Sequence, residues 1–229
     1  MLHARSEARG RDALERVPGA AGVLTGDLSS IAQTRALAEQ ANASGRFHAV
    51  IHNAALGYQV PDRSETEDGL AAVFAVNVLA PYLLTALMTR SDRLVYMSSG
   101  MHTGGDPSLD DLQWRDRRWS GTQAYSDSKL FDLALAFAVA RRWPDVLSNA
   151  VTPGWVATKM GGRGAPDDLD LGADTQAWLA VSDEPAARVS GRYLYHRAER
   201  PGDPAASDPA LQDGLLAACA ELTGVTLPG

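Results

Sequence analysis

The chain has 229 residues, of which 21 are basic and 28 acidic, so its formal net charge is −7. This length predicts one α/β domain or two small ones, and the acidic balance argues against a nucleic-acid-binding surface. The single cysteine, Cys219, excludes an internal disulfide framework and is typical of a reducing compartment.

Short apolar, β-branched runs alternate with longer helical patterns. The predicted strands are residues 1–4, 22–25, 47–52, 93–98, 146–151 and 191–196. The predicted helices are residues 6–16, 29–43, 68–89, 123–143, 170–182 and 208–223. This alternation predicts an α/β fold with a doubly wound parallel sheet and helices on both of its faces. No shift in composition divides the chain, so we expect a single domain over residues 1–229.

One uncharged segment, residues 70–88, approaches the length of a membrane span. It contains Asn77, Pro81, Tyr82 and Thr85, however, and a helix buried on most sides of a sheet-based domain is the better interpretation. The N-terminus lacks the apolar stretch of a secretory signal. We therefore expect no membrane span and a cytoplasmic protein.

Ligands of such folds bind at the carboxyl ends of the strands, so the residues that follow each strand are the candidates for chemistry. In chain order these are Arg5, Ser6, Asp27, Leu28, Asn53, Ala54, Ala55, Ser98, Ser99, Pro153, Gly154, Val156 and Thr158. Asn77 lies within the long apolar helix. Tyr125 and Lys129 lie near the start of the next helix.

Tyr125 and Lys129 are four residues apart, which places both side chains on one face of a helix. A free phenol titrates near pH ~10, and a nearby cation favours its phenolate. A lysine and a second positive charge beside it could supply the roughly 4 kcal/mol that brings such a group into the neutral range. The pair therefore predicts a proton donor or acceptor that works near neutral pH.

No metal site is expected. His48 and His52 have the spacing of a helical metal pair, but they fall in a predicted strand. At ~3.3 Å per residue their Cα atoms would lie about 13 Å apart, which is too far for one ion.

The ordered set of strand-end residues resembles the short-chain dehydrogenase/reductase family over nearly the whole chain. The stretches Thr66-Glu67-Asp68-Gly69-Leu70, Asn77-Val78-Leu79-Ala80-Pro81 and Ala124-Tyr125-Ser126-Asp127-Ser128-Lys129-Leu130 are most similar to its retinol-dehydrogenase-like branch. The resemblance implies a Rossmann-like fold, with a cofactor half in residues 1–120 and a catalytic and substrate half in residues 121–229. A homodimer through the two long central helices is a further expectation.

The resemblance also implies an oxidoreductase that transfers a hydride between a nicotinamide cofactor and a small carbonyl or alcohol substrate. Tyr125 would be the proton donor or acceptor, Ser99 would hydrogen-bond the reacting oxygen, and Asn77 would hold a water that links Lys129 to solvent. Without the family, Asn77 is more often a satisfied core amide, and Ser98 remains open to simple turn chemistry. We expect the connection between Ser99 and Tyr125, with Met101, His102, Trp114 and Trp119, to line part of the substrate pocket.

For the cofactor, the residue after the family's second strand contacts the adenosine ribose, where arginine favours a 2′-phosphate. Arg5 occupies that position and Ser6 follows it, so we expect NADP(H) over NAD(H). Asp27 and Leu28 would contact the adenine. The other expected cofactor contacts are Asn53, Ala54, Ala55, Tyr125, Lys129, Pro153, Gly154, Val156 and Thr158.

One departure from the family concerns the pyrophosphate. The family begins with a strand and a glycine-rich turn, whereas residue 1 of this chain corresponds to the start of the family's second strand. In the strand order 3-2-1-4-5-6 the absent strand is central, which predicts a gap or two unpaired edges. A late start or N-terminal truncation, direct pairing of the flanking strands, and a catalytically impaired or inactive dinucleotide-binding remnant are the three explanations.

Overall fold

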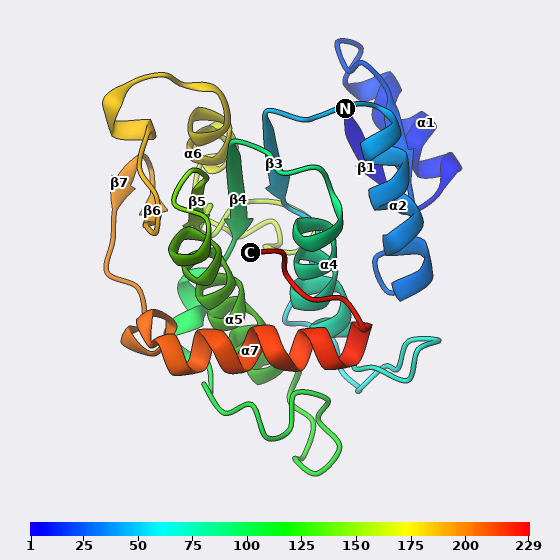
Figure 1. Cartoon of the computed structure of the whole chain (residues 1–229), viewed down its shortest axis with the longest axis vertical. Coiled ribbons are helices and arrows are strands. Elements are labelled where there is room, and N and C mark those ends of the chain that lie inside the picture. The colour runs from blue at the N-terminus through cyan, green and yellow to red at the C-terminus, as the bar shows by residue number, and fades with distance from the viewer.

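The computed structural model describes all residues, 1–229, and the strands alternate with helices as predicted (Figure 1). The strands are β1 (Leu2–Ala4), β2 (Val23–Thr25), β3 (Ala49–His52), β4 (Arg93–Met97), β5 (Leu147–Val151), β6 (Tyr193–Tyr195) and β7 (Ala198–Glu199). The helices are α1 (Glu7–Arg16), α2 (Ile31–Ala43), α3 (Ala72–Phe74), α4 (Ala80–Leu87), α5 (Gly121–Arg142), α6 (Leu169–Val181) and α7 (Pro209–Thr223). The predicted doubly wound, Rossmann-like α/β architecture is confirmed.

The strands form two separate sheets. The larger has the order β3-β4-β5-β6-β7, with β3 to β6 parallel and β7 antiparallel to β6. The smaller consists of β1 and β2 alone, paired in parallel. Strand β7, which forms the antiparallel edge of the sheet, was not predicted from the sequence.

Strands β1 and β3 each have an edge with no strand beside it. Direct pairing of these two strands, one of the expected alternatives, is not found, because β1 pairs only with β2 and β3 only with β4. A cavity of about 380 Å³ lies between them and is lined largely by apolar side chains, including Leu2, Leu24 and Ile51. In Figure 1 the blue segment with β1, α1 and α2 stands beside the main sheet.

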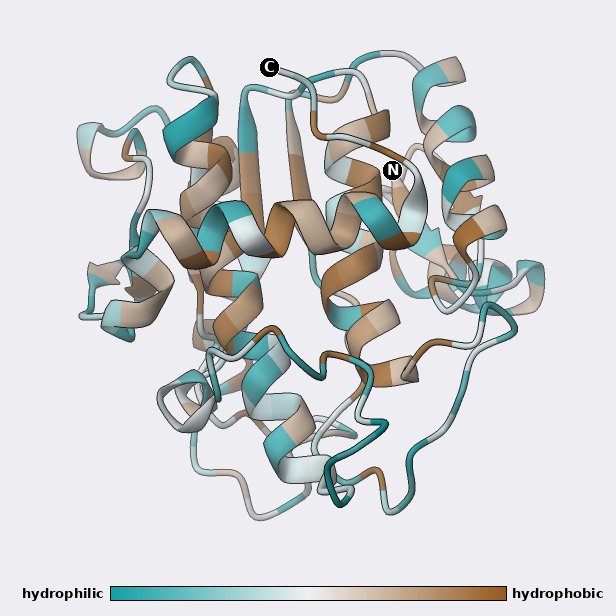
Figure 2. Cartoon of the chain, turned by 60° about the horizontal axis from the view of Figure 1, so that its bottom comes forward, coloured by the Kyte–Doolittle hydropathy of each residue, from teal (hydrophilic) through white to brown (hydrophobic).

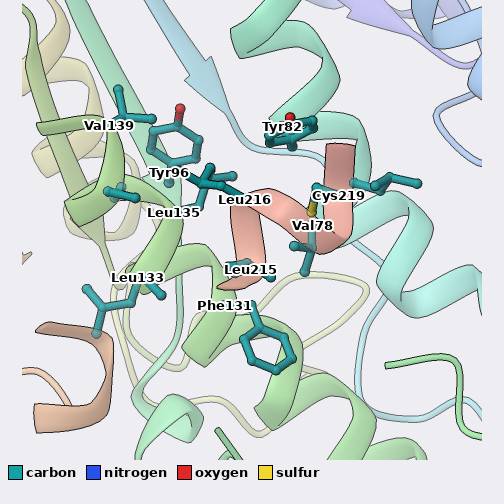
Figure 3. Packing of buried hydrophobic residues seen from close by; sticks show 14 of the residues in the cluster. Val78, Tyr82, Tyr96, Phe131, Leu133, Leu135, Val139, Leu215, Leu216 and Cys219 are labelled. Atoms are coloured by element: carbon teal, nitrogen blue, oxygen red, sulfur yellow. The ribbon is translucent and has the colours of Figure 1, made fainter. Parts of the chain in front are cut away.

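The two-residue period of a strand sorts the core into two layers. Leu94 and Tyr96 of β4 face the larger cluster, which α4, α5 and α7 complete; Figure 3 shows Tyr96 among side chains of these helices. Val95 and Met97 face the other side of the sheet, where they pack with Trp178 of α6. Full burial of each such side chain contributes roughly 1.5–3 kcal/mol, so β4 is anchored from both faces.

The uncharged segment predicted as a single helix contains an irregular turn. Its helical part begins at Ala72 and runs through α3, a π-helical turn (Ala75–Leu79) and α4. Nearly all of its side chains are buried against the sheet and α5. Figure 2 shows the apolar character of these central helices. None of the helices combines the length and the hydropathy that a transmembrane span needs.

Helix α7 and the last residues of the chain cover α4 and α5, as Figure 1 shows by the red helix that crosses in front of them. The Tyr82 hydroxyl donates to the Val225 carbonyl at 2.6 Å, and the Trp143 indole donates to the Pro228 carbonyl at 2.9 Å. These contacts leave the two central helices without a broad exposed face. The homodimer stays a prediction, and these helices lend it no support.

Candidate active site

Helix α5 brings Tyr125 and Lys129 together. The Ser120 hydroxyl accepts a hydrogen bond from the Gln123 amide, a cap that defines the first turn of the helix. Tyr125 and Lys129 follow on one face and are only 7% and 2% exposed. The Lys129 Nζ lies 5.5 Å from the centroid of the Tyr125 ring. The phenol and the ammonium therefore lie together in a largely buried environment.

A carboxylate that sequence analysis missed holds the lysine. Lys129 Nζ donates to Asp132 Oδ2 at 2.7 Å and to the Met97 carbonyl at 2.8 Å. Burial raises the pKa of Asp132 to about 6, although the Lys129 charge and hydrogen bond act in the opposite direction. The signal in the sequence is the three-residue spacing from Lys129 to Asp132, which on an exposed helix face would be an ordinary surface pair.

The two serines after β4 point to different partners. Ser98 is buried, and its hydroxyl donates to the Lys129 carbonyl at 2.8 Å, which fastens the end of β4 to α5. The Ser99 Oγ accepts from the Met101 amide at 3.2 Å, so its own proton remains free to be donated. Ser99 caps the 3₁₀ turn Gly100–Gly104 and lines the main cavity of the protein.

Asn77 lies in the π-helical turn, a distortion that is frequent at functional sites. Its Oδ1 accepts a hydrogen bond from the Leu56 amide at 2.8 Å. Its Nδ2 donates to the Leu56 carbonyl at 3.0 Å and to the Ser128 hydroxyl at 2.9 Å. None of these bonds reaches Lys129, and Asn77 does not line the cavity. The arrangement is that of a satisfied core amide that joins the segment after β3 to α5.

The main cavity lies at the carboxyl ends of β4 and β5 and measures about 790 Å³. The candidate residues that line it are Asn53, Ser98, Ser99, Tyr125, Pro153, Gly154, Val156 and Thr158. Lys129 and Asn77 lie outside this lining. A mostly apolar cleft of this size with a few polar groups is the usual form of a small-molecule site.

The loop after β5 forms one wall of the cavity. Gly154 has a φ of +87°, and a side chain there would collide with the Asp167 carboxylate and the Tyr195 ring. The Asp167 carboxylate accepts a hydrogen bond from the Trp155 amide, and Val156 is bridged to Asp167. Glycine is thus required at position 154, because both its backbone angle and its neighbours exclude a Cβ.

The residues expected to contact adenosine lie away from this cavity. Arg5 follows β1 and Asp27 follows β2. Burial alone would raise the pKa of Asp27. Hydrogen bonds from Ser29 and the charge of Arg5 outweigh this effect and hold the pKa of Asp27 below its ordinary value. The Ser6 hydroxyl accepts weakly from the Arg9 amide as the cap of α1, at 3.5 Å. Leu28, Asn53 and Ala54 line the second cavity, while Arg5, Ser6, Asp27 and Ala55 line neither.

The residues present fit a nicotinamide cofactor at one end. The Gly154 wall, Thr158 and Asn53 border the same space as Ser99 and Tyr125, so a flat ring can lie beside the reacting groups. At the other end, Arg5 and Asp27 lie at the ends of two parallel strands, where doubly wound folds bind the adenosine half.

Several aromatic residues have roles other than those expected. Met101 lines the cavity, but His102 is buried against Tyr193, and Trp114 and Trp119 pack against each other outside it. The lining residues that were not predicted from the sequence include Tyr58, Tyr195 and Arg200. Tyr58 packs edge-on against Tyr125, with 5.9 Å between the two ring centroids.

Comparison with known proteins identifies the family. The chain matches the family model described as enoyl-(acyl carrier protein) reductase over residues 1–186. It is 46% identical to an uncharacterized oxidoreductase of Emericella nidulans, with 100% of this chain and 89% of the relative covered. A short-chain dehydrogenase of Penicillium rubens is 41% identical, with 99% and 88% covered. The chain belongs to the short-chain dehydrogenase/reductase family. Human retinol dehydrogenase 13 is a further relative, 30% identical with 71% of this chain and 57% of that protein covered.

Solved structures support the fold. An uncharacterized protein from Mycobacterium paratuberculosis superposes with a TM-score of 0.82 at 27% identity, with 99% of this chain and 84% of that chain covered. The NADPH-bound carbonyl reductase from chicken fatty liver gives a TM-score of 0.61 at 17% identity, with 88% and 85% covered. The second likeness is evidence for the fold alone.

Proposed function

We propose that the protein transfers a hydride between NADP(H) and a carbonyl or alcohol substrate, with Tyr125 as the proton donor or acceptor. The observation that carries this proposal is that Ser99 and Tyr125 open onto one cavity, with Lys129 buried beside the phenol. The family supports the reaction class, since the relatives with assigned names are dehydrogenases and oxidoreductases.

In the direction of reduction, the Tyr125 hydroxyl donates its proton to the carbonyl oxygen as negative charge develops there. The Ser99 hydroxyl donates a hydrogen bond to the same oxygen, which its contact with the Met101 amide leaves it free to do. The Lys129 ammonium stabilises the phenolate that remains on Tyr125. NADPH, when bound, supplies the hydride.

Asp132 and Asn77 act as positioning residues in this proposal. Asp132 holds the Lys129 ammonium in place within a buried environment, where an unpaired charge would be costly. Asn77 fixes Ser128, the neighbour of Lys129, through its amide. The water that the family resemblance assigns to Asn77 would have to reach Lys129 by way of Ser128 or the backbone.

The cofactor contacts follow the strand ends. Pro153, Gly154, Val156 and Thr158 would hold the nicotinamide, with Asn53, Ala54 and Ala55 near the ribose. Arg5, Ser6, Asp27 and Leu28 would hold the adenosine half. Arg5 favours NADP(H), because a guanidinium binds a 2′-phosphate, while an acid at that position favours the free hydroxyl of NAD(H).

The test is steady-state oxidation of NADPH with a panel of aliphatic, aromatic and isoprenoid carbonyl compounds, together with a separate binding titration of NADPH. We expect turnover with at least one class of carbonyl. NADPH binding without turnover of any member of the panel would contradict the proposal and favour the catalytically inactive dinucleotide-binding protein.

A further inference from the structure

We propose that the substrate carries an anionic group, such as a carboxylate, and that Arg200 binds it at the mouth of the cavity. This inference rests on the proposed function, because it names the class of substrate that the same site takes. Arg200 is exposed, yet its side chain borders the cavity shared by Ser99 and Tyr125.

The charge of Arg200 is unopposed within the cavity. Among the 23 residues that line it, Arg200 is the only charged one, and no aspartate or glutamate is present. The remaining lining is apolar, aromatic or neutral and polar, for example Met101, Trp155 and Gln176. An anion that enters this space therefore contacts one cation and no carboxylate, because the Asp167 carboxylate lies behind Gly154 and accepts the Trp155 amide.

Arg200 also lacks the partner that the neighbouring arginines have. Arg192 pairs with Glu199 at 3.0 Å, and Arg197 pairs with Asp174. The Arg200 side chain makes no ion pair or hydrogen bond within the protein. All five of its N–H donors remain available to a ligand.

The backbone holds Arg200 in place. Its amide donates to the Tyr193 carbonyl at 2.9 Å, next to the β6–β7 hairpin, and its guanidinium lies 5.8 Å from the centroid of the Tyr195 ring. Tyr195 in turn lies against Gly154, the wall beside which the nicotinamide would sit. Arg200, Tyr195 and Gly154 thus form a continuous path from the mouth to the reaction centre.

These features favour a carbonyl compound with an apolar or aromatic body and an acidic group at one end. The planar guanidinium pairs with a carboxylate through two parallel hydrogen bonds, which lysine cannot reproduce. In the reaction the hydride adds to the carbonyl carbon of the substrate and NADP⁺ forms. Tyr125 protonates the oxygen, so an alcohol results and the acidic group is unchanged.

The experiment uses 4-acetylbenzoate and its methyl ester, two ketones that differ in charge. We expect the wild-type protein to bind the acid about tenfold more tightly than the ester in calorimetric titrations with NADP⁺ present. R200Q should abolish this preference, because it weakens binding of the acid and leaves binding of the ester unchanged. R200K should retain part of the preference. R163Q is the matched control, because Arg163 is exposed on a nearby loop and does not line the cavity.

The outcomes separate this inference from the proposed function. The inference is overturned if the wild-type protein binds the acid and the ester equally, or if R200Q weakens binding of both equally. This holds even where the ester is reduced normally. If R200Q instead weakens NADPH binding and leaves the acid unaffected, Arg200 contacts the cofactor and the inference is also overturned. Preferred binding of the acid without reduction would uphold the anion site and count against the proposed reaction.

Discussion

The Lys129 ammonium lies 2.7 Å from the Asp132 carboxylate, and each residue is only 2% exposed. The same ammonium lies beside the Tyr125 ring. The charge that would stabilise a phenolate on Tyr125 is thus already shared with a buried acid, so Asp132 influences both the stability of the fold and the proposed proton transfer.

Replacement of Asp132 by asparagine should change how stability depends on pH. Burial raises the pKa of Asp132 to about 6 in the folded protein, above its unfolded value of 3.8, so the folded state binds this proton more tightly. The contribution of this group to the free energy of unfolding is therefore largest below pH 3.8 and is lost as pH rises to about 6. D132N should remove this loss between pH 4 and 6, as measured by urea unfolding at several pH values. An unchanged pH dependence would contradict the assignment.

Replacement of Lys129 by methionine should slow alcohol oxidation. Without the ammonium, a phenolate on Tyr125 loses its stabilising charge, so kcat should fall about tenfold or more. The double variant K129M/D132N serves as the control, because it leaves no buried carboxylate unpaired. A wild-type kcat in both variants would show that Lys129 does not act on the phenol.

Replacement of Arg5 by aspartate should reverse the cofactor preference. The carboxylate repels a 2′-phosphate and accepts a hydrogen bond from the 2′-hydroxyl, so the KM for NADPH should rise about tenfold or more while that for NADH falls. Steady-state kinetics with both cofactors provide the measurement. R9Q, which changes an exposed arginine on α1, should leave both values unchanged. Equal effects of the two substitutions would contradict the role of Arg5.

The smaller sheet should be the less protected part of the fold. β1 and β2 have three residues each, and a sheet of two such strands is at most marginally stable without other support. Helix α1 packs on this sheet, and α2 joins it to the rest of the fold, where Asn42 bonds to Leu87 and Thr89 beside α4. Hydrogen exchange followed by mass spectrometry should show faster exchange for β1 and β2 than for β4 and β5. Equal protection would contradict this view of the two sheets.

Local patterns were sufficient to predict much of the fold and part of the site. The spacing of Tyr125 and Lys129 and the position of Ser99 after a strand depend on neighbouring residues only, and the structure has them where the pattern predicts. The hairpin between β6 and β7 carried no such signal. Its turn residues His196 and Arg197 have positive φ values of 48° and 58° without the usual glycine or asparagine.

Residues whose role depends on burial were harder to predict from the sequence. Asp132 would be a surface charge if α5 were exposed, and only the packing of α5 between the sheet and α7 makes it a buried partner of Lys129. Arg200 reaches the cavity because the β6–β7 hairpin brings it into the same lining as Gly154, 46 positions earlier in the sequence. Trp114 and Trp119 were expected near the substrate, but they pack with Val73 and Ala124 in a separate cluster instead.

The most direct test of the central claim is the effect of replacing Tyr125 by phenylalanine, which removes only the hydroxyl. We predict that Y125F binds NADPH as the wild-type protein does but reduces the best carbonyl substrate about 10²–10⁴-fold more slowly, the usual contribution of a positioned proton donor. A Y125F variant that keeps the wild-type rate of NADPH oxidation would contradict the assignment of Tyr125 as the proton donor.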